Sequence, residues 1–254
     1  MIKIQRVSAP SELNDETVST LTTLYKSTGE NVWNKPYIKK ELLKMSHNKC
    51  CYCELKLGEE GKYMQVEHYH CKSLYPDEVV LWENLLPSCN RCNTNKSSHD
   101  TKKEPIINPC CDNPSDYLYM ENYRLKSKDN NLIGCTTIDV LYLNESDSLV
   151  LPRFNIGNKI QEKLQFLEDL LIDYIDGNNS TRRRNRIING LKDLLSLADP
   201  TKEYSATAAT VIITDGTYQL MQKQLERLSL WTDDLQYLHD IAVKKRRDFR
   251  GRVF

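Results

Sequence analysis

The 254-residue sequence has no net charge, no long hydrophobic run and no secretion signal. Its 35 Lys and Arg residues balance 35 Asp and Glu residues, so any nucleic-acid contact must come from local basic patches. No apolar run approaches the roughly 18 residues that a membrane span needs, and no apolar core follows Met1 to Arg6. We therefore expect a soluble, cytoplasmic protein without a membrane partner.

Cysteine is abundant instead: there are nine, an odd number. A reducing compartment keeps such thiols free, which favours metal binding over a disulfide framework. Cys50-Cys51-Tyr52-Cys53 and Cys89-Asn90-Arg91-Cys92 each contain a Cys-x2-Cys pair, whose tight turn points both thiolates at one ion. We predict a structural Zn²⁺ site with the ligands Cys50, Cys53, Cys89 and Cys92. Cys51 remains an alternative to Cys50. We expect structural roles for Cys71, Cys110, Cys111 and Cys135.

The chain divides by pattern into three segments: an N-terminal helical extension, a Cys- and His-rich core and a mainly helical C-terminal region. Their bounds are 1–48, 49–116 and 117–254. Proline positions and apolar spacing predict helices at 10–25, 36–45, 156–174, 187–195, 220–228 and 235–241. In the core, short extended pieces are expected at 63–70 and 82–89, followed by a short helix or turn at 90–98. The fold class is therefore α+β.

Between the cysteine pairs lie Val66-Glu67-His68 and Trp82-Glu83-Asn84-Leu85-Leu86, and the second pair continues as Cys92-Asn93-Thr94-Asn95-Lys96. In this order the features resemble the HNH nucleases, whose ββα-metal core commonly lies between two zinc knuckles. The longer runs 66–73 and 82–89 look like the PtuB-like subfamily of Septu-type anti-phage defence systems, which also occurs with some retrons. That subfamily usually has Arg-Pro where this chain has His70-Cys71. The resemblance implies an HNH core at 49–116.

The catalytic residues follow from chemistry and from this resemblance. His68 is the expected general base, because an imidazole with a pKa of about 6.5 can take a proton from water at neutral pH. Family correspondence implies Glu67 and Asn93 as ligands of a catalytic Mg²⁺ or Mn²⁺. Neighbours on a strand face opposite sides, so Glu67 and His68 can share a site only if the strand is bent or bulged. Asn84, the middle motif residue, is expected to orient the histidine. His70 is an alternative base or metal helper.

Several basic residues are candidates for phosphate contacts. Lys96 falls at the family's lysine, and Arg91 lies inside the second cysteine pair. The densest positive patches are 182–186 and 244–252, and both could follow a phosphate backbone. We expect His47, His99 and His239 to be non-catalytic.

The resemblance thus implies a metal-dependent endonuclease that hydrolyses phosphodiester bonds of DNA. It also implies a partner, a PtuA-like ATPase subunit of the same operon, which we expect to dock on the helices after residue 150. Two alternatives remain open. One is an RNA nuclease that cleaves tRNA in a retron-type system, and the other is a catalytically inactive, zinc-scaffolded nucleic-acid-binding module. Retention of His68 and the other motif residues argues against the inactive module.

Overall fold

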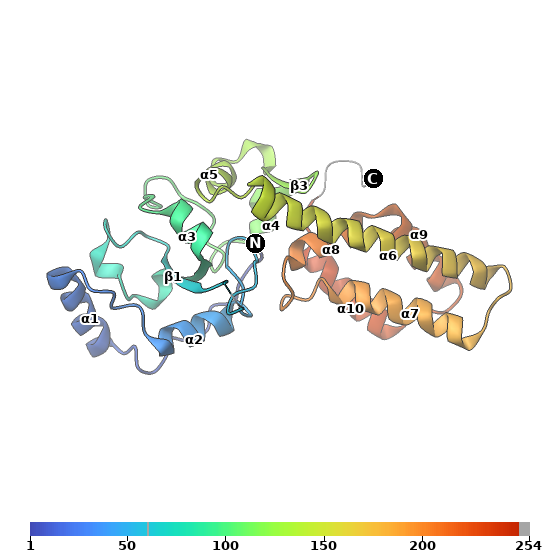
Figure 1. Ribbon diagram of the computed structural model, residues 1–254, viewed down its shortest axis with the longest axis horizontal. Coiled ribbons are helices and arrows are strands. Elements are labelled where there is room, and N and C mark those ends of the chain that lie inside the picture. Colours follow the sequence, from blue (N-terminus) through green and yellow to red (C-terminus); the bar gives the residue numbers. More distant parts are fainter. Residues whose placement is uncertain (60, 249–254) are drawn as a thin grey trace. The chain divides into compact units, whose positions relative to one another are not determined.

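The computed structural model describes residues 1–59 and 61–248, which form two compact units (Figure 1). The first unit comprises Met1–Tyr117 and Lys126–Leu143. The second comprises Leu118–Leu125 and the chain from Asn144 onward. Over the described ranges, none of the helices combines the length and apolarity required for a membrane crossing.

In the described residues of the first unit, the main elements are five α-helices and one strand pair. They are α1 (Asp15–Thr28), α2 (Pro36–Met45), β1 (Met64–His68), β2 (Leu85–Cys89), α3 (Asn90–Lys96), α4 (Pro114–Tyr117) and α5 (Leu132–Val140). The expected helix at 36–45 is confirmed, with Pro36 in its first turn. The helix expected from Pro10 instead begins at Asp15, because Asn14 caps it by accepting from the Thr17 N–H. Gly29, with φ 74°, ends it.

The sheet of this unit is a two-stranded antiparallel ladder. β1 pairs with β2 in a regular register from Met64↔Cys89 to His68↔Leu85. Helices α2 and α3 both contact both strands, and Figure 1 shows them on either side of β1. This double cover explains why every β2 side chain is buried and why the sequence lacks a clear alternation. Because α3 begins directly after β2, the second cysteine pair lies at the strand–helix junction.

The second unit is mainly helical. It contains β3 (Leu118–Glu121), α6 (Leu151–Ile175), α7 (Thr181–Ser196), α8 (Ser205–Thr214), α9 (Gly216–Arg227) and α10 (Asp233–Lys245). β4 (Arg124–Ser127) pairs with β3 and returns the chain to the first unit. The expected helices after residue 150 are confirmed as α6, α7, α9 and α10. They pack around α8, which the sequence analysis missed.

Helix α8 was missed because it has no polar face. Its residues from Ser205 to Ile213 are all buried, so the apolar periodicity of a surface helix is absent. The fold is thus α+β with a helical C-terminal part, as expected. Residues 1–48 lie in the same unit as residues 49–116. The basic segment 244–252 begins at the end of α10, and its part from 249 lies outside the described residues.

Candidate functional site

Four thiols from the two cysteine pairs converge at the base of the β1–β2 ladder. The Sγ atoms of Cys50, Cys53, Cys89 and Cys92 all lie within 4.8 Å of one another, and all four side chains are buried. Cys89 ends β2 and also accepts from the Cys92 N–H at 3.4 Å, which fixes the turn between the two sulfurs. This cluster can hold a metal ion, and it ties the segment before β1 to the junction of β2 and α3.

Of the two alternatives Cys50 and Cys51, the structure places Cys50 in the cluster. Cys51 is buried but does not belong to the cluster. Burial raises the pKa of the Cys51 thiol well above its ordinary value, whereas hydrogen bonds from neighbouring thiols overcome burial at Cys50 and hold its pKa well below. The geometry therefore groups Cys50, and not Cys51, with the other three thiols.

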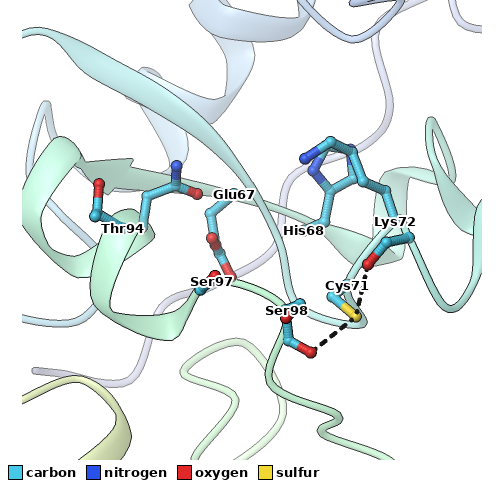
Figure 2. A pocket seen from close by; sticks show the side chains of 9 residues that line it. Glu67, His68, Cys71, Lys72, Thr94, Ser97 and Ser98 are labelled. Atoms are coloured by element: carbon cyan, nitrogen blue, oxygen red, sulfur yellow. Dashed lines mark hydrogen bonds between the residues drawn. The ribbon is translucent and has the colours of Figure 1, made fainter. Parts of the chain in front are cut away.

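A cavity of about 340 Å³ lies where β1 ends and α3 runs past it (Figure 2). Its lining includes Glu67 and His68 from β1 and Asn93 from α3, three of the residues singled out in the sequence. The other lining residues are Cys71, Lys72, Ser73, Thr94, Ser97 and Ser98. Figure 2 shows Glu67 pointing toward Ser97, while His68 lies on the side of Lys72. The ladder register is regular through His68, so no bulge is present, and both residues line the cavity at the strand end.

His68 is buried and held by two contacts. Its Nε2 atom lies 2.8 Å from the carbonyl oxygen of Val79, and its ring meets that of Trp33 edge to face at 4.9 Å. A carbonyl only accepts, so Nε2 carries the proton and Nδ1 keeps the lone pair. Burial, together with the nearby Lys72 ammonium, lowers the pKa of His68 to about 3. The imidazole is therefore neutral at pH 7, with the lone pair of Nδ1 unprotonated.

Glu67 is buried beside a lysine. The Lys96 Nζ atom lies 2.8 Å from Glu67 Oε1 and donates to the carbonyl oxygen of His68 at 2.7 Å. Burial nevertheless raises the pKa of Glu67 to about 7, against the lowering effect of Lys96. A further cation near Glu67 would lower its pKa, because a nearby positive charge favours the ionised form of a carboxyl group.

Asn84 lies outside the cavity lining and ties together the loop between β1 and β2. Its side chain accepts from the His70 N–H at 2.7 Å and donates to the carbonyls of His70 and Glu78 at 3.0 and 3.1 Å. This loop contains Val79, the hydrogen-bond partner of His68. Asn84 therefore contacts the loop that holds His68, and not His68 itself.

His70, the alternative base, is not among the residues that line the cavity. Its Nδ1 atom lies 2.7 Å from the hydroxyl of Thr101, which itself donates to the carbonyl of Tyr69. Its ring packs against those of Tyr69 and Tyr75. These contacts support a role in bracing the loops around the cavity.

The two residues expected to contact phosphate are engaged elsewhere. Lys96 is 2% exposed and its ammonium group is occupied by Glu67 and a backbone carbonyl. Arg91 donates to the carbonyls of Leu141 and Tyr142 and packs over the Tyr142 ring. In this structure neither residue lines the cavity.

Sequence reasoning missed two residues at the site. Lys72 lines the cavity. It lies four residues after His68 in the run 66–73 that carries the family resemblance, and this position was its only distinguishing feature in the sequence. Trp33 comes from the loop between α1 and α2 and contacts both His68 and Lys72. Nothing in its local sequence distinguishes Trp33 from a core aromatic residue.

Comparison with known proteins adds an independent line of evidence. No family model matches the chain. The chain is 47% identical to a Septu protein PtuB of Bacillus thuringiensis, over 94% of this chain and 92% of that protein. It is 24% identical to a Septu protein PtuB of Bacillus mycoides (strain KBAB4), over 83% of this chain and 89% of that protein. At this level of identity and coverage, the chain belongs to the family of Septu PtuB proteins.

Proposed function

We propose that this protein is a metal-dependent HNH endonuclease that hydrolyses phosphodiester bonds of DNA in bacterial anti-phage defence. One observation carries the proposal: Glu67, His68 and Asn93 line a single cavity at the end of a β–β–α unit that four thiols tie together. A proton acceptor beside two oxygen ligands is the combination that metal-assisted hydrolysis requires. Membership of the PtuB family supports the role in defence.

The thiol cluster fits a structural zinc ion. A tetrahedral ion with Zn–S bonds of about 2.3 Å keeps its sulfurs about 3.8 Å apart. The Sγ atoms of Cys53 and Cys89 are 3.7 Å apart, and the cluster is closed on all sides by protein. Such an ion would fix the distance between the first cysteine pair and α3, and with it the position of Asn93 relative to β1.

His68 is suited to take the proton of the attacking water. Its Nε2–H is committed to the Val79 carbonyl, which orients the ring and leaves Nδ1 as the accepting atom. The negative charge of a bound phosphodiester would raise the pKa of the imidazole and so increase its basicity. Removal of the ring should therefore abolish cleavage.

Glu67 and Asn93 supply carboxylate and amide oxygens, the ligand types of Mg²⁺ and Mn²⁺. The raised pKa of Glu67 fits this role, because a divalent cation would favour the ionised carboxylate in a buried position. When bound, the ion would stabilise charge on the phosphate and on the departing oxygen. The residues of this chain would hold the ion and orient the base.

We further propose a PtuA-like ATPase as the partner, docked on the second unit. Large apolar side chains are exposed there, including Ile172 and Ile175, which lie one turn apart on α6 with exposed fractions of 51% and 48%. Adjacent exposed apolar residues are typical of protein–protein contacts.

The test uses the purified full-length protein with its ATPase partner on plasmid DNA and on tRNA, with Mg²⁺, Mn²⁺ or EDTA. We expect cleavage of DNA that needs the divalent ion and is lost in His68→Ala. The matched control is His99→Ala, because the Nε2 atom of His99 also meets a backbone carbonyl, that of Glu104 at 2.8 Å, outside the cavity. Cleavage of tRNA but not of plasmid DNA would show that the substrate is RNA. Equal cleavage by His68→Ala and wild type would refute the mechanism.

A further inference from the structure

The cavity contains one lysine, Lys72, that forms no ion pair within the described part of the chain. This inference rests on the proposed nuclease function and concerns how the same cavity holds its substrate. Lys72 is the one Lys or Arg among the residues that line the cavity. The negative charge of Glu67 is already matched by Lys96, whereas no ion pair of Lys72 is seen in the described part of the chain. An anion entering the cavity would therefore meet Lys72.

Trp33 holds this lysine in place. The Lys72 Nζ atom lies 4.8 Å from the centre of the Trp33 ring. A cation–π contact of this kind orients an ammonium group without cancelling its charge, unlike a carboxylate partner. The ammonium group thus keeps its three N–H donors for a ligand in the cavity.

The same ring also positions the base. Trp33 and His68 meet edge to face, with an angle of 89° between the ring planes. Tyr25 on α1 packs against the Trp33 ring, with a distance of 5.7 Å between the two ring centroids. One side chain from the N-terminal region therefore contacts both the imidazole and the free cation of the cavity.

We propose that Lys72, held on the ring of Trp33, is the residue that contacts the phosphodiester backbone of a nucleic acid bound in the cavity. Lys72 takes the role that the sequence suggested for Lys96 and Arg91, both of which are engaged by the protein itself. Trp33 is a positioning residue that couples the substrate contact to the orientation of His68. The segment 1–48 is then part of the nuclease site.

The first experiment measures binding without cleavage, in the His68→Ala background, with a fluorescein-labelled DNA duplex and a labelled tRNA at increasing NaCl. Loss of one phosphate contact lowers the slope of log affinity against log salt by about 0.9 on duplex DNA. We expect this change in Lys72→Met, with binding about threefold to tenfold weaker at low salt, and recovery of the slope in Lys72→Arg. Lys102→Met is the matched control, because Lys102 lies 4.0 Å over the Tyr75 ring in the same unit but outside the cavity lining.

The second experiment separates positioning from folding. Trp33→Leu should reduce the single-turnover cleavage rate, and Trp33→Phe should restore most of it, since a phenyl ring keeps both contacts. The double variant Trp33→Leu with Lys72→Met should have the same salt slope as the single variant Lys72→Met.

These outcomes separate the two proposals. If His68→Ala abolishes cleavage but Lys72→Met has the same salt slope as Lys102→Met, the nuclease assignment is supported and the role of Lys72 is overturned. If His68→Ala still cleaves, the nuclease mechanism fails, while the salt slope, measured with EDTA to suppress cleavage, still reports on Lys72. Failure of the His68→Ala protein to bind either nucleic acid, alone or with its ATPase partner, also overturns the role of Lys72.

Discussion

The Nζ atom of Lys96 lies 2.8 Å from Oε1 of Glu67, and both side chains are almost completely buried. The ammonium group also donates to the carbonyl of His68, so it joins α3 to the last two residues of β1. Breaking a buried ion pair leaves a charge without compensation in a low-dielectric environment. This pair therefore places α3 and Asn93 against the strand that carries Glu67 and His68.

The first prediction concerns this pair. Lys96→Met should lower the free energy of unfolding by about 3–5 kcal/mol, because Glu67 then loses its buried partner and must take up a proton or stay buried as an unpaired charge. Chemical denaturation of the purified chain measures the change. Lys62→Met is the control: Lys62 pairs with Glu59 at the surface, and an exposed pair contributes about 0–1 kcal/mol.

The double variant Glu67→Gln with Lys96→Met should recover part of the loss, since it removes both charges. If Lys96→Met instead keeps wild-type stability but weakens nucleic-acid binding, Lys96 is the phosphate contact that the sequence suggested.

The second prediction concerns the four-thiol cluster. Cys53→Ser should lower the zinc content from one ion per chain to a small fraction and destabilise the first unit, because four thiolates are needed for a closed tetrahedral site. Cys51→Ala should keep full zinc content, since its thiol lies outside the cluster. Elemental analysis and thermal unfolding check both results. A zinc loss in Cys51→Ala equal to that in Cys53→Ser would contradict the assignment of ligands.

The sequence predicted those features of the fold that are encoded locally. Pro36 and the following apolar spacing gave α2, and the two Cys-x2-Cys turns gave the ligand cluster. It did not predict α8, whose uniformly buried face removes the periodic signal. At the site, the motif singled out Glu67, His68 and Asn93, and these three residues line one cavity in the structure.

Contacts between distant segments explain the differences at the site. Lys96 forms an ion pair with Glu67, and the two residues come close only because α3 packs on β1. Trp33 reaches His68 from the loop between α1 and α2, a segment without any motif. Local pattern thus singled out residues that meet in one cavity, whereas tertiary packing decides which lysine at that cavity has no ion pair in the described part of the chain.

The third prediction concerns the loop that Asn84 holds. Asn84→Ala should destabilise the chain by about 2–4 kcal/mol, because three backbone groups lose a buried partner. Hydrogen exchange should become faster over residues 70–84, and cleavage should fall because Val79 no longer fixes His68. Asn84→Asp keeps the acceptor for the His70 N–H and should give a smaller loss.

The control for this loop is Asn95→Ala on α3. Asn95 makes a single 3.3 Å hydrogen bond from its side chain to the Leu141 carbonyl, so its loss should cost no more than about 1 kcal/mol. If the two alanine variants have equal stability and equal exchange rates, Asn84 does not hold the loop.

The fourth prediction concerns the partner. Ile172→Glu combined with Ile175→Glu should weaken capture of the co-expressed ATPase by at least about tenfold, because it places two charges in an apolar contact of the kind that dominates interfaces. Leu132→Glu is the matched control, since Leu132 is an apolar side chain that is 81% exposed on the first unit. Both variants should unfold at the wild-type temperature, because the substituted side chains are exposed. Loss of the ATPase in Leu132→Glu, with normal capture by the α6 double variant, would move the docking surface to the first unit.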